Sequence, residues 1–206
     1  MDPKVLSSAL EWVERQTNLC TKQARMLSNG DQGALLQAFS LMIKPMHILE
    51  LGAFTGYSTI CLSRGLQEGG SIDTIEVYDE LEDIIRGGFR KAGLIDIPGK
   101  EDIAHLHIGD AKKIIPTLDK MYDIVYIDAN KREYIEYYDL VFDKVRHGGY
   151  ILADNVLWSG KVLLANPPKD AQTQSIIAFN KKIQEDLRVD NTILPIRDGI
   201  NVIYKL

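Results

Sequence analysis

Side chains that carry oxygen atoms directly follow two apolar segments in the second half of the chain. Asp128 follows the largely apolar residues 122–127. Asp154 and Asn155 follow a second apolar segment, residues 150–153. If these segments are neighbouring parallel strands, their carboxyl ends meet at one edge of a sheet and the three side chains converge. Carboxylate and carboxamide oxygens suit a Mg²⁺-type ion, which keeps positions for water or substrate, and capping of the strand ends is the alternative interpretation.

A basic residue lies close to the first of these carboxylates. Lys131 follows Asp128 by three residues, so its amine can reach the same site. A nearby divalent cation disfavours the ammonium form of a lysine, which makes this residue a candidate general base. A solvated surface lysine is the alternative. The histidines are scattered and lack the spacing of a zinc site: His47, His105, His107 and His147.

A glycine-containing loop follows an apolar segment in the first half of the chain. Gly52 and Gly56 lie between residues 48–51 and a helical segment. Glycine lets the backbone turn tightly and approach a ligand without obstruction by a Cβ atom. The loop is typical of nucleotide binding, although the dinucleotide fingerprint GxGxxG and the GKS/T ending of a phosphate loop are both missing. A plain tight turn is the alternative.

Two further acidic residues stand at the ends of predicted strands. Glu76 lies 20 residues after Gly56, where a carboxylate can accept both hydroxyls of an adenosine ribose. A solvated glutamate at a strand end is the alternative. Asp110 precedes the small residue Ala111, and it is a candidate helix N-cap as well as a candidate ligand.

Short apolar segments alternate with amphipathic ones from Met46 onward. Strands are predicted at residues 47–51, 71–77, 104–108, 122–128, 150–153, 192–196 and 201–204. Helices are predicted around residues 81–92, 134–145 and 176–187, and within residues 3–42 with a break at Asn29-Gly30-Asp31. This alternation indicates parallel strands joined by helices, and the short connection before the last strand indicates an antiparallel hairpin. The expected fold class is α/β, a Rossmann-like, seven-stranded, mostly parallel sheet with helices on both faces.

Composition and charge limit the class of protein. The length fits a single domain over residues 1–206, with a helical segment at about residues 1–45. Lys and Arg number 24 against 29 Asp and Glu, for a net charge of -5, and no basic run is present. Nucleic acid is therefore not an expected partner. The apolar runs are too short for a membrane span, and two cysteines without a CxxC pair favour a reducing cytoplasm.

Four segments in this order carry a family resemblance. They are LELGAFTGYS at residues 49–58, DANK at residues 128–131 with Tyr134, DNVLWSG at residues 154–160 and LPIRDG at residues 194–199. Together they resemble the cation-dependent class I S-adenosylmethionine O-methyltransferases of catechol-like molecules, the group of caffeoyl-CoA and catechol O-methyltransferases. The resemblance extends over about residues 21–206.

The resemblance implies a function and a set of site residues. A divalent ion, Mg²⁺, would be held by Asp128, Asp154 and Asn155, with Lys131 as the general base. S-adenosylmethionine would be the methyl donor, and its expected binding residues are Glu50, Gly52, Tyr57, Ser58, Glu76, Asp110, Ala111 and Asp128. The acceptor would be a small aromatic molecule with vicinal hydroxyls, and the expected assembly is a homodimer.

Departures from the family pattern leave the acceptor open. Asn130 stands where plant members commonly have aspartate, and Arg197 where glycine is common. The surface loop expected at residues 159–171 is also individual. Two other classes of function are considered: a nucleotide-dependent oxidoreductase, against which the missing GxGxxG argues, and a non-catalytic S-adenosylmethionine-binding module, against which the retained Lys131 argues.

Overall fold

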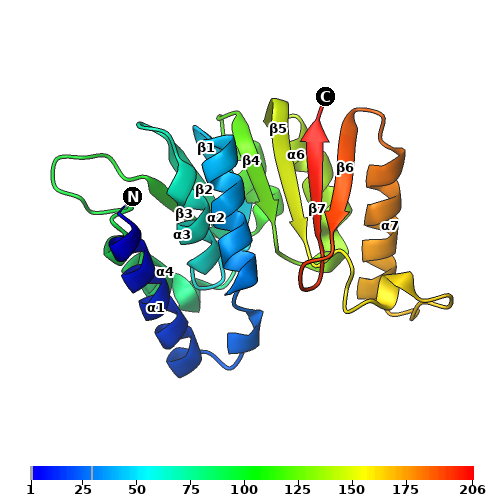
Figure 1. Ribbon diagram of the computed structural model, residues 1–206, viewed down its shortest axis with the longest axis horizontal. Coiled ribbons are helices and arrows are strands. Elements are labelled where there is room, and N and C mark those ends of the chain that lie inside the picture. Colours follow the sequence, from blue (N-terminus) through cyan, green and yellow to red (C-terminus); the bar gives the residue numbers. More distant parts are fainter. Residues whose placement is uncertain (1, 29) are drawn as a thin grey trace. The chain divides into compact units, whose positions relative to one another are not determined.

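The computed structural model describes residues 2–28 and 30–206. Met1 lies outside the described residues, and so does Asn29, which belongs to the predicted helix break. The backbone contacts of the chain cluster into two compact units, Met1–Asp110 and Ala111–Leu206. Each unit combines parallel strands with helices (Figure 1).

The first unit contains three parallel strands in the order β3-β2-β1. These strands are β1 (His47–Leu51), β2 (Ser71–Glu76) and β3 (Ala104–Ile108). The helices are α1 (Pro3–Cys20), α2 (Asp31–Ile43), α3 (Tyr57–Leu62) and α4 (Glu82–Ala92), with the 3₁₀ turns η1 (Ala24–Met26), η2 (Ser63–Gly65) and η3 (Asp79–Leu81). Every residue of β2 is buried, as is typical of a parallel strand that is covered on both faces.

Two adjacent glycines let α1 pack closely against α4. A Cβ atom on Gly87 would lie 2.5 Å from the ring of Trp12, and one on Gly88 would lie 2.6 Å from Val13. Carbon atoms do not approach this closely in packed interiors, so larger residues at these two positions would separate the helices. The N-terminal helix is thereby fixed within the unit that carries the glycine loop.

The second unit contains four strands in the order β4-β5-β7-β6. These strands are β4 (Tyr122–Ile127), β5 (Val145–Asp154), β6 (Val189–Leu194) and β7 (Ile200–Lys205). The helices are α5 (Ala111–Ile114), α6 (Tyr134–Phe142) and α7 (Ala171–Glu185), with the 3₁₀ turns η4 (Ile115–Thr117), η5 (Lys131–Glu133) and η6 (Lys161–Leu163). β4 and β5 are parallel, whereas β7 is antiparallel to both β5 and β6. The predicted C-terminal hairpin is confirmed.

Several predicted boundaries in the second unit are wrong, and two of them have a clear physical reason. The helix predicted to reach residue 145 ends at Phe142, and Val145 begins β5 by pairing with Tyr122. Helical spacing relates Val145 to the helix before it, but pairing with a distant strand overrides that local pattern. The strand predicted at residues 192–196 ends at Leu194, because Pro195 has no N–H group to donate to a neighbouring strand.

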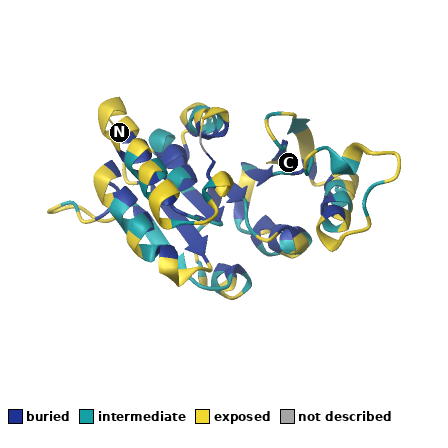
Figure 2. Cartoon of the chain, turned by 90° about the horizontal axis from the view of Figure 1, so that it is seen from below, coloured by how far each residue is buried: buried dark blue, intermediate teal, exposed yellow. Residues whose placement is uncertain are grey.

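The strands are largely buried, and the helices keep exposed outer sides (Figure 2). Tyr126 and Tyr134 are among the largest side chains that are fully buried. A phenol hydroxyl inside a protein needs a hydrogen-bond partner, so these tyrosines mark polar contacts in the interior of the second unit. Among the described residues, no helix has the length and apolar character that crossing a bilayer requires.

Candidate active site

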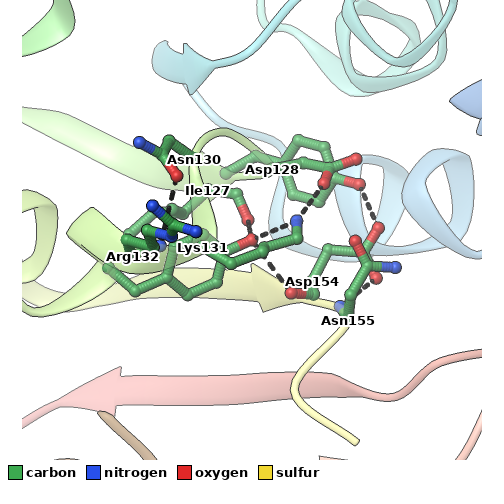
Figure 3. A network of polar contacts seen from close by, with 9 residues as sticks. Ile127, Asp128, Asn130, Lys131, Arg132, Asp154 and Asn155 are labelled. Carbon is green, nitrogen blue, oxygen red and sulfur yellow. Dashed lines mark hydrogen bonds and ion pairs between the residues drawn. The ribbon is translucent and has the colours of Figure 1, made fainter. Parts of the chain in front are cut away.

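The turn after β4 places a lysine against a carboxylate. Asp128 follows the last residue of β4, and the 3₁₀ turn η5 begins three residues later with Lys131. The Nζ atom of Lys131 lies 2.6 Å from Asp128 Oδ1 and 2.6 Å from the hydroxyl oxygen of Tyr134 (Figure 3). Lys131 is buried, so the alternative of a solvated surface lysine is wrong.

Tyr134 contacts the ends of both strands that precede the predicted metal ligands. Its hydroxyl lies 3.1 Å from the carbonyl oxygen of Ile127 and 3.0 Å from that of Asp154. It also accepts a hydrogen bond from Lys131. Complete burial raises the pKa of Tyr134 well above its usual value, and the charges of Asp128 and Asp154 raise it further. The phenol therefore stays protonated, and its one O–H hydrogen is shared between these two carbonyls.

The end of β5 supplies the second carboxylate. Tyr126 donates a hydrogen bond of 2.8 Å to Asp154 Oδ2, and the backbone N–H of Asn155 donates one of 2.7 Å to Asp154 Oδ1. Burial is the main cause that raises the pKa of Asp154, followed by the negative charge of Asp128. The structure therefore brings Asp128, Lys131, Asp154 and Asn155 together within the second unit (Figure 3).

The donor set of this cluster has the chemistry of a hard-cation site. Asp128, Asp154 and Asn155 offer two carboxylates and one carboxamide. Among the described residues, no group of three or more His, Cys, Asp or Glu side chains could hold a metal ion. The predicted set contains only two acids, and its third member is the carboxamide of Asn155. Burial first, and the charge of Asp128 second, raise the pKa of Asp154, and a divalent cation would relieve the repulsion between the two carboxylates.

The glycine loop of the first unit is organised by Glu76. Glu76 Oε2 accepts a hydrogen bond of 2.6 Å from the backbone N–H of Phe54. Glu76 Oε1 accepts bonds of 2.8 Å and 3.0 Å from the N–H groups of Val77 and Tyr78. Only 5% of Glu76 is exposed, so the alternative of a solvated glutamate is wrong. Burial raises the pKa of this carboxyl, and the three N–H donors oppose that shift.

The loop itself needs glycine at its two ends. Gly52 has a φ angle of 96° and Gly56 one of 85°, in the region that side chains with a Cβ atom disfavour. A Cβ atom on Gly56 would also lie 2.9 Å from the ring of Phe89. Phe54 adopts a φ angle of 49°, and its N–H bond to Glu76 holds that conformation. The loop is thus a constrained turn.

Glu50 lies in the interior beneath this loop. It is fully buried, and its Oε2 atom accepts hydrogen bonds from the hydroxyls of Thr59 and Thr74, the latter at 2.6 Å. These contacts connect β1 to α3 and β2, so Glu50 has a supporting position within the unit. Sequence analysis placed Glu50 among the donor-binding residues without this role, because the threonine partners lie 9 and 24 residues away in the chain.

The N-terminal helices contact the loop and the start of α3. The hydroxyls of Thr17 and Thr55 share a buried hydrogen bond of 2.8 Å. A Cβ atom on Gly33 would lie 2.8 Å from the ring of Tyr57, so glycine allows this approach. Burial raises the pKa of Tyr57 to about 12. Ser58, the second residue of α3, is also buried.

The remaining two candidate residues stand at the boundary between the units. Asp110 is the last residue of the first unit, and Ala111 is the first residue of the second. Ala111 begins α5 and is buried. Gly52, Tyr57, Ser58 and Glu76 belong to the first unit, whereas Asp128, Lys131, Asp154 and Asn155 belong to the second.

A family match covers almost the whole chain. The sequence profile of the O-methyltransferase family matches residues 4–206. The chain belongs to this O-methyltransferase family. The predicted class of enzyme, an S-adenosylmethionine-dependent methyltransferase, is confirmed, and the alternative of an oxidoreductase is wrong.

The relatives of this chain include a caffeoyl-CoA O-methyltransferase, a group that the sequence resemblance named. Caffeoyl-CoA O-methyltransferase 2 of Petunia hybrida is 30% identical over 199 residues, which covers 88% of this chain and 77% of the relative. Tricin synthase 1 of Oryza sativa subsp. japonica is 30% identical over 189 residues, covering 88% of this chain and 75% of that protein.

Solved structures match the full length of the chain. The O-methyltransferase of Bacillus cereus in complex with SAH has a TM-score of 0.84 and 28% identity, and the match covers 100% of this chain and 92% of that one. TomG of Streptomyces achromogenes, in complex with SAM, has a TM-score of 0.83 and 27% identity, covering 100% and 91%. The predicted fold class, a Rossmann-like, mostly parallel seven-stranded sheet with an antiparallel end, is confirmed.

Proposed function

We propose that this enzyme transfers the methyl group of S-adenosylmethionine to one hydroxyl of a vicinal dihydroxy aromatic molecule, with the help of a divalent cation, Mg²⁺. One observation carries the proposal: Lys131, Asp128, Asp154 and Asn155 form one polar cluster after two buried strands. Caffeoyl-CoA O-methyltransferases among the relatives support the O-methyl transfer.

The methyl donor would bind at the glycine loop. We assign to it Gly52, Tyr57, Ser58, Glu76, Asp110, Ala111 and Asp128, whereas the predicted Glu50 is buried and would act by supporting the loop from the interior. The constrained turn between Gly52 and Gly56 offers backbone close to a ligand, and Glu76 offers a carboxylate at the end of β2. Relatives that contain SAM or SAH support this assignment. A sulfonium methyl is already activated, so the protein has to supply an aligned oxygen nucleophile.

Asp128, Asp154 and Asn155 would hold the divalent cation. Their oxygens suit a hard ion, and the burial of Asp154 limits competition from water. When bound, the cation supplies Lewis acidity that makes a coordinated hydroxyl more acidic and fixes its direction. Tyr126 and the N–H of Asn155 orient the Asp154 carboxylate for this role, as outer partners commonly do at metal sites.

Lys131, in the neutral amine form that a neighbouring divalent cation would favour, would accept the proton of the reacting hydroxyl. Its Nζ atom is held by Asp128 and Tyr134, both at 2.6 Å, so the side chain has little freedom to turn away. A base in a fixed position lowers the cost of proton transfer in the transition state. Asp128 and Tyr134 therefore orient Lys131 toward an acceptor that binds at the same cluster.

The acceptor should carry two neighbouring hydroxyls. A vicinal diol could offer two oxygens to the bound cation, whereas a monophenol would offer one and leave its ring free to rotate. Catechols should therefore be methylated much faster than phenols. Retention of Lys131 in its fixed position also argues against a non-catalytic binding module.

The test is a methyl-transfer assay followed by mass spectrometry. Purified protein is incubated with S-adenosylmethionine and catechol, after rigorous treatment with EDTA and then with added Mg²⁺. We expect methylated catechol only when Mg²⁺ is restored. Full activity after metal removal would refute the metal-dependent mechanism, and donor binding without product would favour the non-catalytic module.

Four expectations about partners and location stay predictions. The family resemblance implies a homodimer, which light scattering on the purified protein would test. We also expect no nucleic-acid partner, because the chain has a net charge of -5, and no membrane partner. The cytoplasm is the expected location, and fractionation of source cells would check it.

A further inference from the structure

A second lysine fastens the outer side of the turn that carries Lys131. Lys112 lies on α5, and its Nζ atom is 2.7 Å from Glu133 Oε1 and 3.3 Å from Glu136 Oε2. Tyr137 donates a hydrogen bond of 2.5 Å to the other oxygen, Glu133 Oε2. Both carboxylate oxygens of Glu133 are therefore engaged, one by α5 and one by α6.

Glu133 is the last residue of η5, the turn that begins with Lys131. The backbone N–H of Glu133 donates to the carbonyl oxygen of Asn130 at 3.0 Å, and the side chain of Asn130 caps the same turn. The turn is thus held on its inner side through Lys131 and on its outer side through Glu133. A displaced Glu133 would shift the backbone that positions the Lys131 amine.

Lys112 and Glu133 belong to a network of polar contacts and are not an isolated surface ion pair. The side chains of Lys112 and Glu133 are 34% and 26% exposed, and each has a second partner. The hydrogen bond to Glu133 raises the pKa of Lys112, and the same bond lowers the pKa of Glu133. Networks of this kind retain geometry better than isolated exposed pairs do.

We infer that Lys112 is a positioning residue for the reaction: through Glu133 it ties the turn that carries the base to α5, the helix that begins with the proposed donor-binding residue Ala111. The inference rests on the function proposed above. Lys112 touches neither reacting group and acts through Glu133 and Lys131.

The decisive variant is Lys112→Met, with Lys113→Met as its matched control. Lys113 is the next residue of α5 and is exposed, so the control removes the same charge from the same helix. We expect Lys112→Met to lower kcat about 3- to 10-fold with a smaller change in KM for catechol, as for loss of a charge-assisted hydrogen bond. Lys112→Arg should restore most of the turnover. The double variant with Glu133→Gln and Lys112→Met should lower kcat no more than either single variant does.

A second measurement does not depend on activity. In protein labelled with ¹³C at the lysine ε carbons, the signal of Lys131 is assigned by its absence from Lys131→Met. We expect Lys112→Met to move this signal and Lys113→Met to leave it in place. An unchanged Lys131 signal in Lys112→Met overturns the inference. If the wild-type enzyme methylates catechol, equal turnover of Lys112→Met and Lys113→Met also overturns the inference. If the wild-type protein does not methylate catechol, the proposed function is refuted. The Lys131 signal alone then decides whether Lys112 is a positioning residue.

Discussion

Replacing Tyr134 by phenylalanine should damage both stability and turnover. The change removes only the hydroxyl, since the ring keeps its edge-on contact with Phe179 at 5.4 Å between centroids. The lost group accepts from the Lys131 ammonium and donates to the carbonyls of Ile127 and Asp154. A bond to a charged group contributes about 1.5 to 3 kcal/mol and a neutral one about 1 kcal/mol, so the free energy of unfolding should fall by about 2 to 4 kcal/mol.

The effect on turnover follows from the same contacts. Without the phenol, Lys131 keeps Asp128 as its fixed partner and its amine can turn away from the acceptor. We expect kcat to fall about tenfold or more, with little change in donor affinity, because Tyr134 lies outside the proposed donor-binding residues. Steady-state kinetics with catechol and titration calorimetry with S-adenosylmethionine separate these two quantities.

Tyr138→Phe is the matched control. Tyr138 lies one helical turn further along α6, also contacts Phe179, and donates to Asp186 at 2.9 Å. This control should lower the free energy of unfolding in urea but leave kcat close to the wild-type value. If the two variants have equal kcat values, or if Tyr134→Phe is as stable as the wild type, the network assigned to Tyr134 is wrong.

Three other predictions test the donor, the base and an acid-sensitive ion pair. Glu76→Gln should raise the Kd for S-adenosylmethionine about tenfold or more, and calorimetry with unchanged affinity would reject this role for Glu76. Lys131→Ala should lower kcat about 100-fold with little change in catechol binding, so undiminished turnover would refute its assignment as the base. Arg188 holds the pKa of Asp186 below its usual value. The stabilisation from this ion pair is therefore present above about pH 4 and lost as the pH falls below that value. In urea unfolding, acid should lower the free energy of unfolding less in Asp186→Asn than in the wild type.

The fold was predictable where apolar segments are short and bounded. The strands at residues 47–51 and 104–108 coincide with β1 and β3, because each is an isolated apolar segment between turn residues. β5 was predicted too short, since its first half contains exposed residues and Gly148, which has a φ angle of 76°. Pairing of Val145 with Tyr122 extends the strand, and no local pattern reveals a pairing across 23 residues.

The second-unit site was predictable from spacing, but its supporting partners were not. Asp128 and Lys131 are three residues apart, so a single turn brings them together. Tyr126 lies inside an apolar strand and contacts Asp154, 28 residues later. Sequence indicates that Tyr126 is buried, whereas its hydrogen bond depends on the register between β4 and β5. The tyrosines inside apolar segments were the available signal, because buried phenols seek partners.

The contacts of Glu76 also constrain how it can bind a donor. A carboxylate has about four lone-pair sites, and three of those of Glu76 already accept from Phe54, Val77 and Tyr78. One site is left for a ribose hydroxyl unless a loop N–H gives way, so the expectation that Glu76 accepts both hydroxyls requires movement of the loop. In the proposed function Glu76 would therefore have two roles, since the bonds that shape the glycine loop also fix the carboxylate that would meet the ribose. Donor affinity and loop conformation should for this reason change together in any variant that removes a charge from this position.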